Sequence, residues 1–378
     1  MLRAATPSMT DPSVIPPGTV AVSDYERLAR ERLPPAVWAF LASGSADGIT
    51  LRRNRQAFDD LCLLPRALAD MKSATTATHL LGRILDWPVL LAPVALQRLF
   101  HPEGERAVAV AAKAAATGMI LSTESSVSLE EIAALGHPGP LWFQLYMQAD
   151  RDFTRELVRR AEQNGYGAIV FTVDAPVSLR NAEERAGFAV PEGIEAVNLR
   201  GAVAAPASPV AAGKSPVFSG MLRNAAVWAD LEALCAATAL PVLAKGIIAP
   251  DDAERALAAG VSGIVVSNHG GRALDTAPAA IEVLPAIAEK VGGRVPLIVD
   301  GGIRRGTDLL KALALGAEAV LIGRAYAMAL AAAGPAGVLH ALTILRTEFE
   351  AAMALTGCVS PADIGPHLLW NGPASPRR

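Results

Sequence analysis

Short apolar runs rich in Val, Ile and Leu recur along the chain and alternate with segments that carry helix signals. The runs are continuously apolar, which is typical of strands that are covered on both faces in a parallel sheet. Among the segments between them, residues 128–135 place Ser128 and Glu131 at capping-box spacing. The apolar runs span residues 88–95, 118–123, 141–146, 168–174, 241–247, 263–268, 296–302 and 319–324.

Eight such strand–helix units predict an α/β fold, the eight-stranded (β/α)8 TIM barrel. An open doubly wound sheet is the alternative, but no G-x-G-x-x-G joins a strand to a helix in this chain. We expect a flexible tail over residues 1–20 and a single barrel domain over residues 21–378. Residues 22–85 are predicted to form helices that cap one end of the barrel. Residues 175–239 form an oversized connection after the fourth strand, which indicates an active-site lid or a disordered loop.

Composition narrows the class of protein further. The chain has 378 residues, of which 52% are hydrophobic and 19% charged, and its net charge is −3. Without a long basic run, nucleic acid is not an expected partner. The cysteines, Cys62, Cys235 and Cys358, lie far apart, which argues against a thiolate metal site and fits a reducing cytosol. The start of the chain lacks the apolar core of a secretory signal, and the longest apolar stretch, 327–339, is too short for a bilayer. We therefore expect a soluble, cytoplasmic protein without a metal.

Polar side chains stand at the carboxyl ends of the predicted strands, where reactive groups collect in barrels of this kind. The stretch "VSNHGGRALD" at 266–275, which contains His269 and Arg272, is by itself compatible with a simple turn. Polar residues also stand at the ends of the other predicted strands. Each of them would need a hydrogen-bonding partner if it were buried in a core, so together they favour an active-site rim over a simple turn. Those residues are Ser122, Thr123, Gln144, Tyr146, Thr172, Asp174, Lys245, Asn268, Asp300 and Arg324.

Two glycine-rich segments, "DGGIRRGTD" at 300–308 and "IGRA" at 322–325, follow the seventh and eighth predicted strands. Loops at these positions often form a phosphate site, and Arg304 and Arg324 supply matching charge. Either loop alone is compatible with an ordinary turn and a solvated arginine. Both together predict a cofactor that carries a phosphate.

In their order and spacing, "SNHGGRALD" and "DGGIRRGTD" resemble the FMN-dependent α-hydroxy acid oxidases and dehydrogenases. The resemblance covers nearly the whole chain and includes "LASGSADGITLRRNRQAF" at 41–58, "APVALQRLFHPEGE" at 92–105, "WFQLY", "FTVDAP" and "LAKGI". It implies FMN as cofactor and oxidation of an (S)-2-hydroxy acid to the 2-oxo acid. Residues 92–105 look closest to the mandelate and hydroxymandelate branch. Relatives are commonly tetramers, so the resemblance also implies a homotetramer.

The resemblance assigns roles to individual residues. His269 matches the base that takes the proton, and Asp174 matches the carboxylate paired with it, which favours imidazolium. Arg272 matches an arginine that holds the substrate carboxylate, and Tyr146 matches a tyrosine that hydrogen-bonds the substrate. Lys245 matches a lysine beside the flavin N1/O2 edge, where negative charge appears on reduction. The implied cofactor-binding set is Pro93, Val94, Ala95, Ser122, Gln144, Thr172, Lys245, Ser267, Asp300, Gly302, Arg304, Gly323 and Arg324.

A second substrate arginine in the family belongs to an R-x-x-D pattern after the fourth strand. The segment "VDAPVSLRNAEERAGF" is one residue short, so counting from its two ends places either Arg180, with Glu183, or Asn181 on that pattern. We predict Arg180, because arginine can bind a carboxylate and a loop absorbs a deletion easily.

Two substrate-pocket positions depart from the glycolate-oxidising members of the family. Phe40 replaces a tyrosine that contacts the substrate, and Glu124 replaces a tryptophan that lines the side-chain pocket. The resemblance therefore does not carry the identity of the substrate. Glu124 either faces the substrate's side chain or turns outward to a surface cation, and the sequence does not decide between the two.

Two other function classes compete with this hypothesis. A different FMN barrel, an isomerase or an NAD(P)-linked enzyme, would share only the phosphate site, and "SNHGGR" with Asp174 argues against it. A non-catalytic barrel would be expected to lack His269 or Lys245. The electron acceptor stays open between oxygen, a quinone and a carrier protein. Membrane-linked members carry an insertion corresponding to residues 189–225, where this chain has few cations, so no membrane partner is expected.

Overall fold

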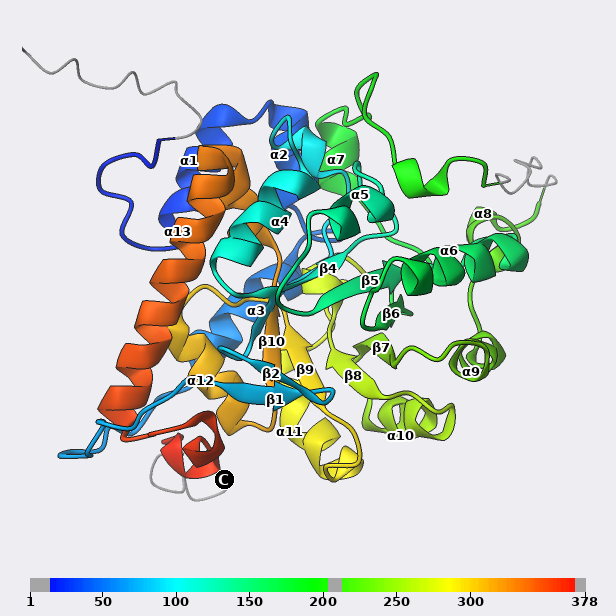
Figure 1. Cartoon of the computed structure of the whole chain (residues 1–378). Coiled ribbons are helices and arrows are strands. Elements are labelled where there is room, and N and C mark those ends of the chain that lie inside the picture. The colour runs from blue at the N-terminus through cyan, green and yellow to red at the C-terminus, as the bar shows by residue number, and fades with distance from the viewer. Residues whose placement is uncertain (1–13, 203–212, 371–378) are drawn as a thin grey trace, which may run out of the picture.

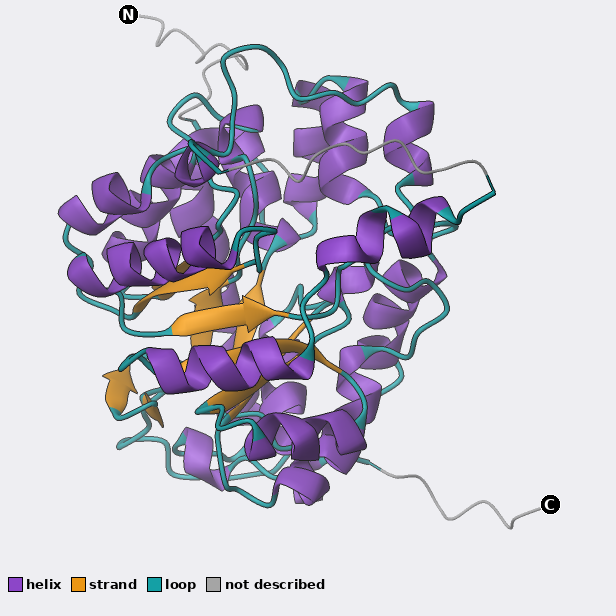
Figure 2. Cartoon of the chain, turned by 90° about the vertical axis from the view of Figure 1, so that its right-hand side faces the viewer, coloured by secondary structure: helices purple, strands orange, loops and turns teal. Residues whose placement is uncertain are grey.

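The computed structural model of the chain describes residues 14–202 and 213–370. Eight parallel strands close into a barrel in the order β10–β3–β4–β5–β6–β7–β8–β9, and helices surround it (Figures 1 and 2). This arrangement confirms the predicted (β/α)8 fold, and each strand falls inside one of the eight apolar runs. The barrel strands are β3 (Val89–Leu91), β4 (Gly118–Leu121), β5 (Leu141–Leu145), β6 (Ile169–Thr172), β7 (Val242–Ile247), β8 (Gly263–Val266), β9 (Leu297–Asp300) and β10 (Ala319–Ile322).

The strands are apolar throughout because both of their faces are buried. Side chains on the outward faces join one core with the helices that pack against the barrel, which are α1 (Asp24–Arg32), α2 (Pro35–Ala42), α3 (Ile49–Asp59), α4 (Glu105–Ala114), α5 (Leu129–Ala134), α6 (Arg151–Gln163), α9 (Trp228–Ala237), α10 (Pro250–Ala258), α11 (Ala280–Val291), α12 (Gly306–Ala314) and α13 (Arg324–Thr356). Two short helices, α7 (Asn181–Arg185) and α8 (Pro216–Ser219), lie outside this core. The inward-facing side chains fill the barrel interior as a second core, which contains Leu90, Ile120, Trp142, Val170, Leu243, Val265, Ile298 and Leu321.

The segment that precedes the barrel is only partly helical, so the prediction of helices throughout residues 22–85 is wrong over its last part. There β1 (Thr78–Leu80) and β2 (Arg83–Leu85) pair as an antiparallel hairpin. Leu80 and Leu85 are buried among the side chains that fill the barrel, so the hairpin closes the amino-terminal mouth (Figure 1). Strands of three residues are too short to give a recognisable alternating pattern.

The last helix, α13, is longer than the apolar stretch at 327–339 indicated, which corrects the prediction that no segment is long enough to span a bilayer. By length and composition α13 is able to cross a membrane, but most of its apolar residues are buried inside the molecule. It packs against α1, α4 and α12, and its backbone leaves helical geometry at Ala333 and Gly334. Core packing therefore accounts for its apolar character.

The connection after β6 is shorter than the predicted 175–239, because α9 lies within that range and takes the place of the barrel helix between β6 and β7. The short helices α7 and α8 belong to the connection itself. Residues 203–212 of this range, and residues 1–13 of the predicted tail, lie outside the described residues.

Candidate active site

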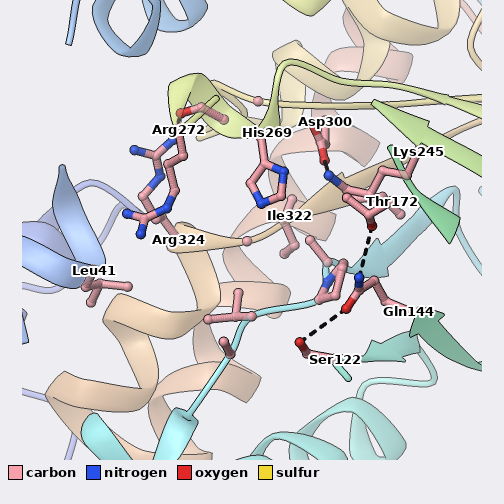
Figure 3. Close-up of a pocket in the computed structure, with 18 of the residues that line it drawn as sticks. Leu41, Ser122, Gln144, Thr172, Lys245, His269, Arg272, Asp300, Ile322 and Arg324 are labelled. Carbon is pink, nitrogen blue, oxygen red and sulfur yellow. Dashed lines mark hydrogen bonds and ion pairs between the residues drawn. The ribbon is translucent and has the colours of Figure 1, made fainter. Parts of the chain in front are cut away.

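A cavity lies at the carboxyl-terminal ends of the barrel strands. Residues from the ends of all eight strands line it, together with Phe40 and Leu41 from α2 (Figure 3). Every residue to which the resemblance assigned a role lines this cavity except Asp174 and Ser267, and of the other strand-end residues Thr123 and Asn268 do not line it. Asp174 and Ser267 lie one contact further out, against His269 and Lys245 respectively. The structure therefore brings the predicted site residues together in one place.

A constrained turn after β8 holds His269 at the cavity. Its φ of 57° lies in the left-handed region, which few residues other than glycine adopt, and Gly270 and Gly271 follow with φ of 61° and 79°. Asn268 accepts a hydrogen bond from the Gly271 N–H at 3.1 Å and exchanges two amide hydrogen bonds with Asn54 of α3, at 2.8 and 2.9 Å. The stretch is thus both a turn and an active-site rim, and α3 holds the strained conformation in place.

The imidazole of His269 lies between a carboxylate and a phenol. Its Nδ1 is 2.9 Å from Oδ1 of Asp174, and its Nε2 is 3.4 Å from the Tyr146 hydroxyl. Burial opposes ionisation of Asp174, but the charges of His269 and Lys245 bring the pKa of its carboxyl below the ordinary value. An ionised Asp174 accepts the proton of Nδ1, which leaves Nε2 as the basic nitrogen at the cavity. Gly246, with φ of 110°, allows this approach, because a Cβ there would collide with Asp174.

Lys245 provides a buried cation on the wall of the cavity. Its Nζ lies 3.3 Å from Oδ2 of Asp300 and donates to the Ser267 hydroxyl at 3.1 Å. Burial opposes the charge, yet Asp300 and Asp174 raise the pKa of Lys245 above its ordinary value. The other oxygen of Asp300, Oδ1, is buried and has no hydrogen-bond partner among the described residues.

A chain of hydrogen bonds fixes the polar groups along β4, β5 and β6 (Figure 3). The Ser122 hydroxyl donates to Oε1 of Gln144 at 3.3 Å, and Nε2 of Gln144 donates to the Thr172 hydroxyl at 3.1 Å. The Thr123 N–H also donates to Oε1 at 3.1 Å, so the orientation of the amide is set. This wall presents fixed donors and acceptors to whatever occupies the cavity.

Arg304 and Arg324 line the cavity without a carboxylate partner within ion-pair distance in the described part of the chain. Arg324 donates through Nη2 to the Gly270 carbonyl, and its Nη1 is buried with no partner. Burial, and then the neighbouring charges of Arg304 and Arg272, lower the pKa of Arg324 to about 9. Burial also lowers the pKa of Arg304. Half-buried guanidinium groups beside other cations favour the binding of an anion.

Helix α3 shapes the loop that carries Arg304. A Cβ at Gly302 would collide with the Asn54 carbonyl, so the packing of this loop against α3 requires glycine at position 302. The sequence had explained this glycine only by a phosphate site. Asp308 accepts from the Arg304 N–H at 2.8 Å and pairs with Arg55 of α3 at 2.5 Å. Asn54 and Arg55 are functional residues that the sequence reasoning missed, although both belong to the stretch "LRRNRQAF" that carried the resemblance.

Arg272 and Arg180 form a second pair of arginines and share a counter-ion. Arg272 donates to the Phe40 carbonyl at 2.7 Å and to Glu183 Oε1 at 2.9 Å, and Oε2 of the same glutamate lies 3.6 Å from Arg180. Glu183 is buried, whereas the side chain of Arg180 is 52% exposed. Arg180 lines the cavity and Asn181 does not, which agrees with the choice of Arg180 for the second arginine.

Glu124 faces the interior of the cavity, so the structure decides between its two possible orientations. Burial raises the pKa of its carboxyl above the ordinary value, and the charges of Arg180, His269 and Arg272 oppose that shift. A carboxyl group therefore stands at the place where the resemblance puts the substrate's side chain.

Aromatic rings form the wall near α2. Phe40 stacks on Phe188, with ring centroids 4.6 Å apart, and lies 6.3 Å from the ring of Phe100. The Arg272 guanidinium sits 5.3 Å from the centroid of the Phe40 ring. Phe100 is a further lining residue that the sequence reasoning did not single out.

The donor set of the cavity fits a phosphorylated flavin. The partnerless Nη1 of Arg324 and the unpaired Arg304 match a phosphate, and the partnerless Oδ1 of Asp300 matches a hydroxyl donor such as a ribityl group provides. The fold and the site are therefore those expected of a barrel flavoenzyme, with a histidine–carboxylate pair and two pairs of arginines in one cavity.

Comparison with known proteins gives the family. The sequence model described as FMN-dependent dehydrogenase matches residues 29–371, and the chain belongs to this family. The chain is 48% identical to L-lactate oxidase of Alicycliphilus denitrificans over 352 residues, which cover 93% of this chain and 96% of that protein. It is 49% identical to 4-hydroxymandelate oxidase of Amycolatopsis orientalis over 344 residues, which cover 90% and 95% of the two proteins.

A crystal structure of mandelate oxidase with (S)-2-phenylpropionate superposes with a TM-score of 0.83 at 46% identity, covering 93% of this chain and 98% of that one. These findings confirm the predicted fold, the FMN cofactor and the enzyme class. The protein is an FMN-dependent enzyme that oxidises 2-hydroxy acids to 2-oxo acids.

Proposed function

We propose that the protein oxidises (S)-2-hydroxy acids, with His269 as the base, and passes the electrons to oxygen. The observation that carries this proposal is the placement of one basic nitrogen, Nε2 of His269, in the same cavity as Arg272 and Arg180. A 2-hydroxy acid offers the complementary pair of groups, a carboxylate and a neighbouring hydroxyl. Bound FMN accepts the two electrons of the oxidation.

Arg272 and Arg180 bind the substrate carboxylate. The guanidinium of Arg272 is already oriented by its hydrogen bonds to Glu183 and the Phe40 carbonyl. A planar fork of N–H donors suits a carboxylate and fixes its orientation. Binding of the carboxylate in this way places the α-carbon and its hydroxyl near His269.

His269 takes a proton from the hydroxyl or from the α-carbon through Nε2. The positive charge that then forms on the imidazole is stabilised by Asp174, which lies 2.9 Å from Nδ1. The Tyr146 hydroxyl, 3.4 Å from Nε2, is placed to hydrogen-bond the oxygen of the substrate.

The remaining lining residues hold the cofactor. Arg304 and Arg324 bind the phosphate, and Asp300 accepts from the ribityl chain. Asp300 maintains the positive charge of Lys245, and this charge would stabilise the negative charge that a bound flavin gains on reduction. The other ring contacts are assigned to Pro93, Val94, Ala95, Ser122, Gln144 and Thr172, whereas Gly302 and Gly323 are assigned to the ribityl and phosphate contacts. The Ser267 hydroxyl accepts from Lys245 Nζ and from the His269 N–H, and so supports both residues.

The variant His269→Ala tests the role of the base. It should retain FMN but reduce its flavin at least about 10²-fold more slowly than the wild type, the usual scale for a general base. Stopped-flow absorbance under nitrogen measures this rate directly, and added imidazole should restore part of it. The variant His367→Ala, at a site remote from the cavity, serves as the matched control. A near wild-type rate in His269→Ala would remove His269 from the mechanism.

We also propose a cytoplasmic homotetramer that uses oxygen. The names of the relatives, L-lactate oxidase and 4-hydroxymandelate oxidase, support oxygen as the acceptor. Cys62, Cys235 and Cys358 are free thiols, which agrees with a reducing compartment. Comparing reoxidation by oxygen and by a soluble quinone tests the acceptor, and light scattering tests the tetramer.

A further inference from the structure

We infer that Glu124 forms a polar subsite for the side chain of the substrate and selects 2-hydroxy acids whose side chain donates a hydrogen bond. This inference rests on the proposed function and adds the class of substrate to it.

The backbone of Glu124 is anchored on two sides. Its N–H donates to the Ser122 hydroxyl at 3.1 Å, and its carbonyl accepts from the Leu96 N–H at 2.9 Å. Ser122 is in turn part of the hydrogen-bonded chain through Gln144. The two loops that follow β3 and β4 therefore hold Glu124 in place and deliver its side chain into the cavity.

The cations that face Glu124 already have other carboxylate partners. Arg272 and Arg180 share Glu183, at 2.9 and 3.6 Å, and His269 pairs with Asp174 at 2.9 Å. Among the described residues, none lies within ion-pair or hydrogen-bond distance of the Glu124 carboxyl oxygens. These oxygens are acceptors without a protein donor.

When a substrate binds, part of it lies against the carboxyl oxygens of Glu124. The carboxylate of the substrate occupies Arg272 and Arg180, so its side chain is the part that reaches Glu124. An apolar side chain there removes water from the carboxyl group and returns no hydrogen bond, which is costly for any polar group and more so for an ionised one. A second carboxylate is repelled. A hydroxyl or an ammonium group replaces the lost water, while Phe40 and Phe100 supply apolar surface beside it.

Small matched substrates test this preference. The (S)-enantiomers of glycerate and 2-hydroxybutyrate differ by a hydroxyl in place of a methyl group, and malate carries a second carboxylate. The wild type should show a kcat/KM about tenfold higher on glycerate than on 2-hydroxybutyrate, roughly 1.4 kcal/mol, and the lowest value on malate. Glu124→Leu should abolish the preference for glycerate and raise kcat/KM for 2-hydroxybutyrate about tenfold.

The isosteric variant Glu124→Gln separates hydrogen bonding from charge. It should keep the preference for glycerate over 2-hydroxybutyrate, because the amide oxygen still accepts, and it should lose most of the discrimination against malate. Glu195→Leu, in which an exposed glutamate outside the cavity is replaced, is the control and should leave all three values unchanged.

The outcomes distinguish this inference from the proposed function. If no 2-hydroxy acid reduces the flavin of the wild type, the proposed function fails. If the substrates reduce the flavin but Glu124→Leu ranks them as the wild type does, the polar subsite alone is overturned. If Glu124→Leu does not fold, the malate and glycerate values of Glu124→Gln decide, and an unchanged discrimination against malate contradicts the inference.

Discussion

Two pairs of arginines line the same cavity, but their surroundings differ. Arg272 and Arg180 share the buried carboxylate of Glu183, whereas Arg304 and Arg324 have no carboxylate within ion-pair distance in the described residues. A cofactor that stays bound can supply a permanent counter-charge. A substrate that must leave after each turnover suits arginines whose charge is already partly neutralised.

The difference also explains the electrostatics of Arg324. The pKa of Arg324 falls to about 9 because the guanidinium is buried beside other cations. A dianionic phosphate would relieve this repulsion, since opposite charges favour the charged form. With the proposed assignment, the two pairs would separate a resident from a transient anion within one cavity.

The largest effect is expected from replacing Arg304 and Arg324, the two arginines without a carboxylate partner in the described residues. The double variant Arg304→Met/Arg324→Met should weaken FMN binding at least about 100-fold, because hydrogen bonds to charged groups contribute about 1.5–3 kcal/mol each. Quenching of FMN fluorescence on reconstitution of the apoprotein measures the Kd. Arg305→Met removes a cation of the same loop that pairs with Glu348 at 2.7 Å and should leave the Kd unchanged. A double variant that purifies with a full complement of FMN would refute the phosphate assignment.

A smaller effect is expected from the paired arginines. Arg272→Lys should raise KM for a 2-hydroxy acid about tenfold, since a point charge does not replace a planar fork of donors, and it should leave the FMN content unchanged. Steady-state kinetics combined with the flavin absorbance of the purified variant give both values. Loss of FMN with an unaltered KM would mean that the roles of the two pairs had been exchanged.

The features that the sequence predicted are those with a local signature. Strands buried on both faces are continuously apolar, and so the barrel was visible in runs such as 141–146. The polar residues at strand ends were visible because they interrupt such runs. The hairpin of β1 and β2 has no such signature, since each strand has three residues.

The features that the sequence missed depend on distant contacts. Asn54 and Asn268 are 214 positions apart, and nothing near either residue indicates that they exchange hydrogen bonds. The orientation of Glu124 likewise depends on Leu96, in a different loop. The length of α13 was underestimated because the continuous apolar stretch ends before His340, whereas the helix runs from Arg324 to Thr356 with polar residues in its second half.

The measurement that tests the account most directly is an anaerobic single turnover by the wild-type protein. One equivalent of an (S)-2-hydroxy acid should bleach the flavin and yield one equivalent of the 2-oxo acid, the (R)-enantiomer should do neither, and mass spectrometry of the released cofactor should show FMN. Release of FAD or of no flavin, or a flavin that is reduced by NAD(P)H but by no 2-hydroxy acid, would contradict the account.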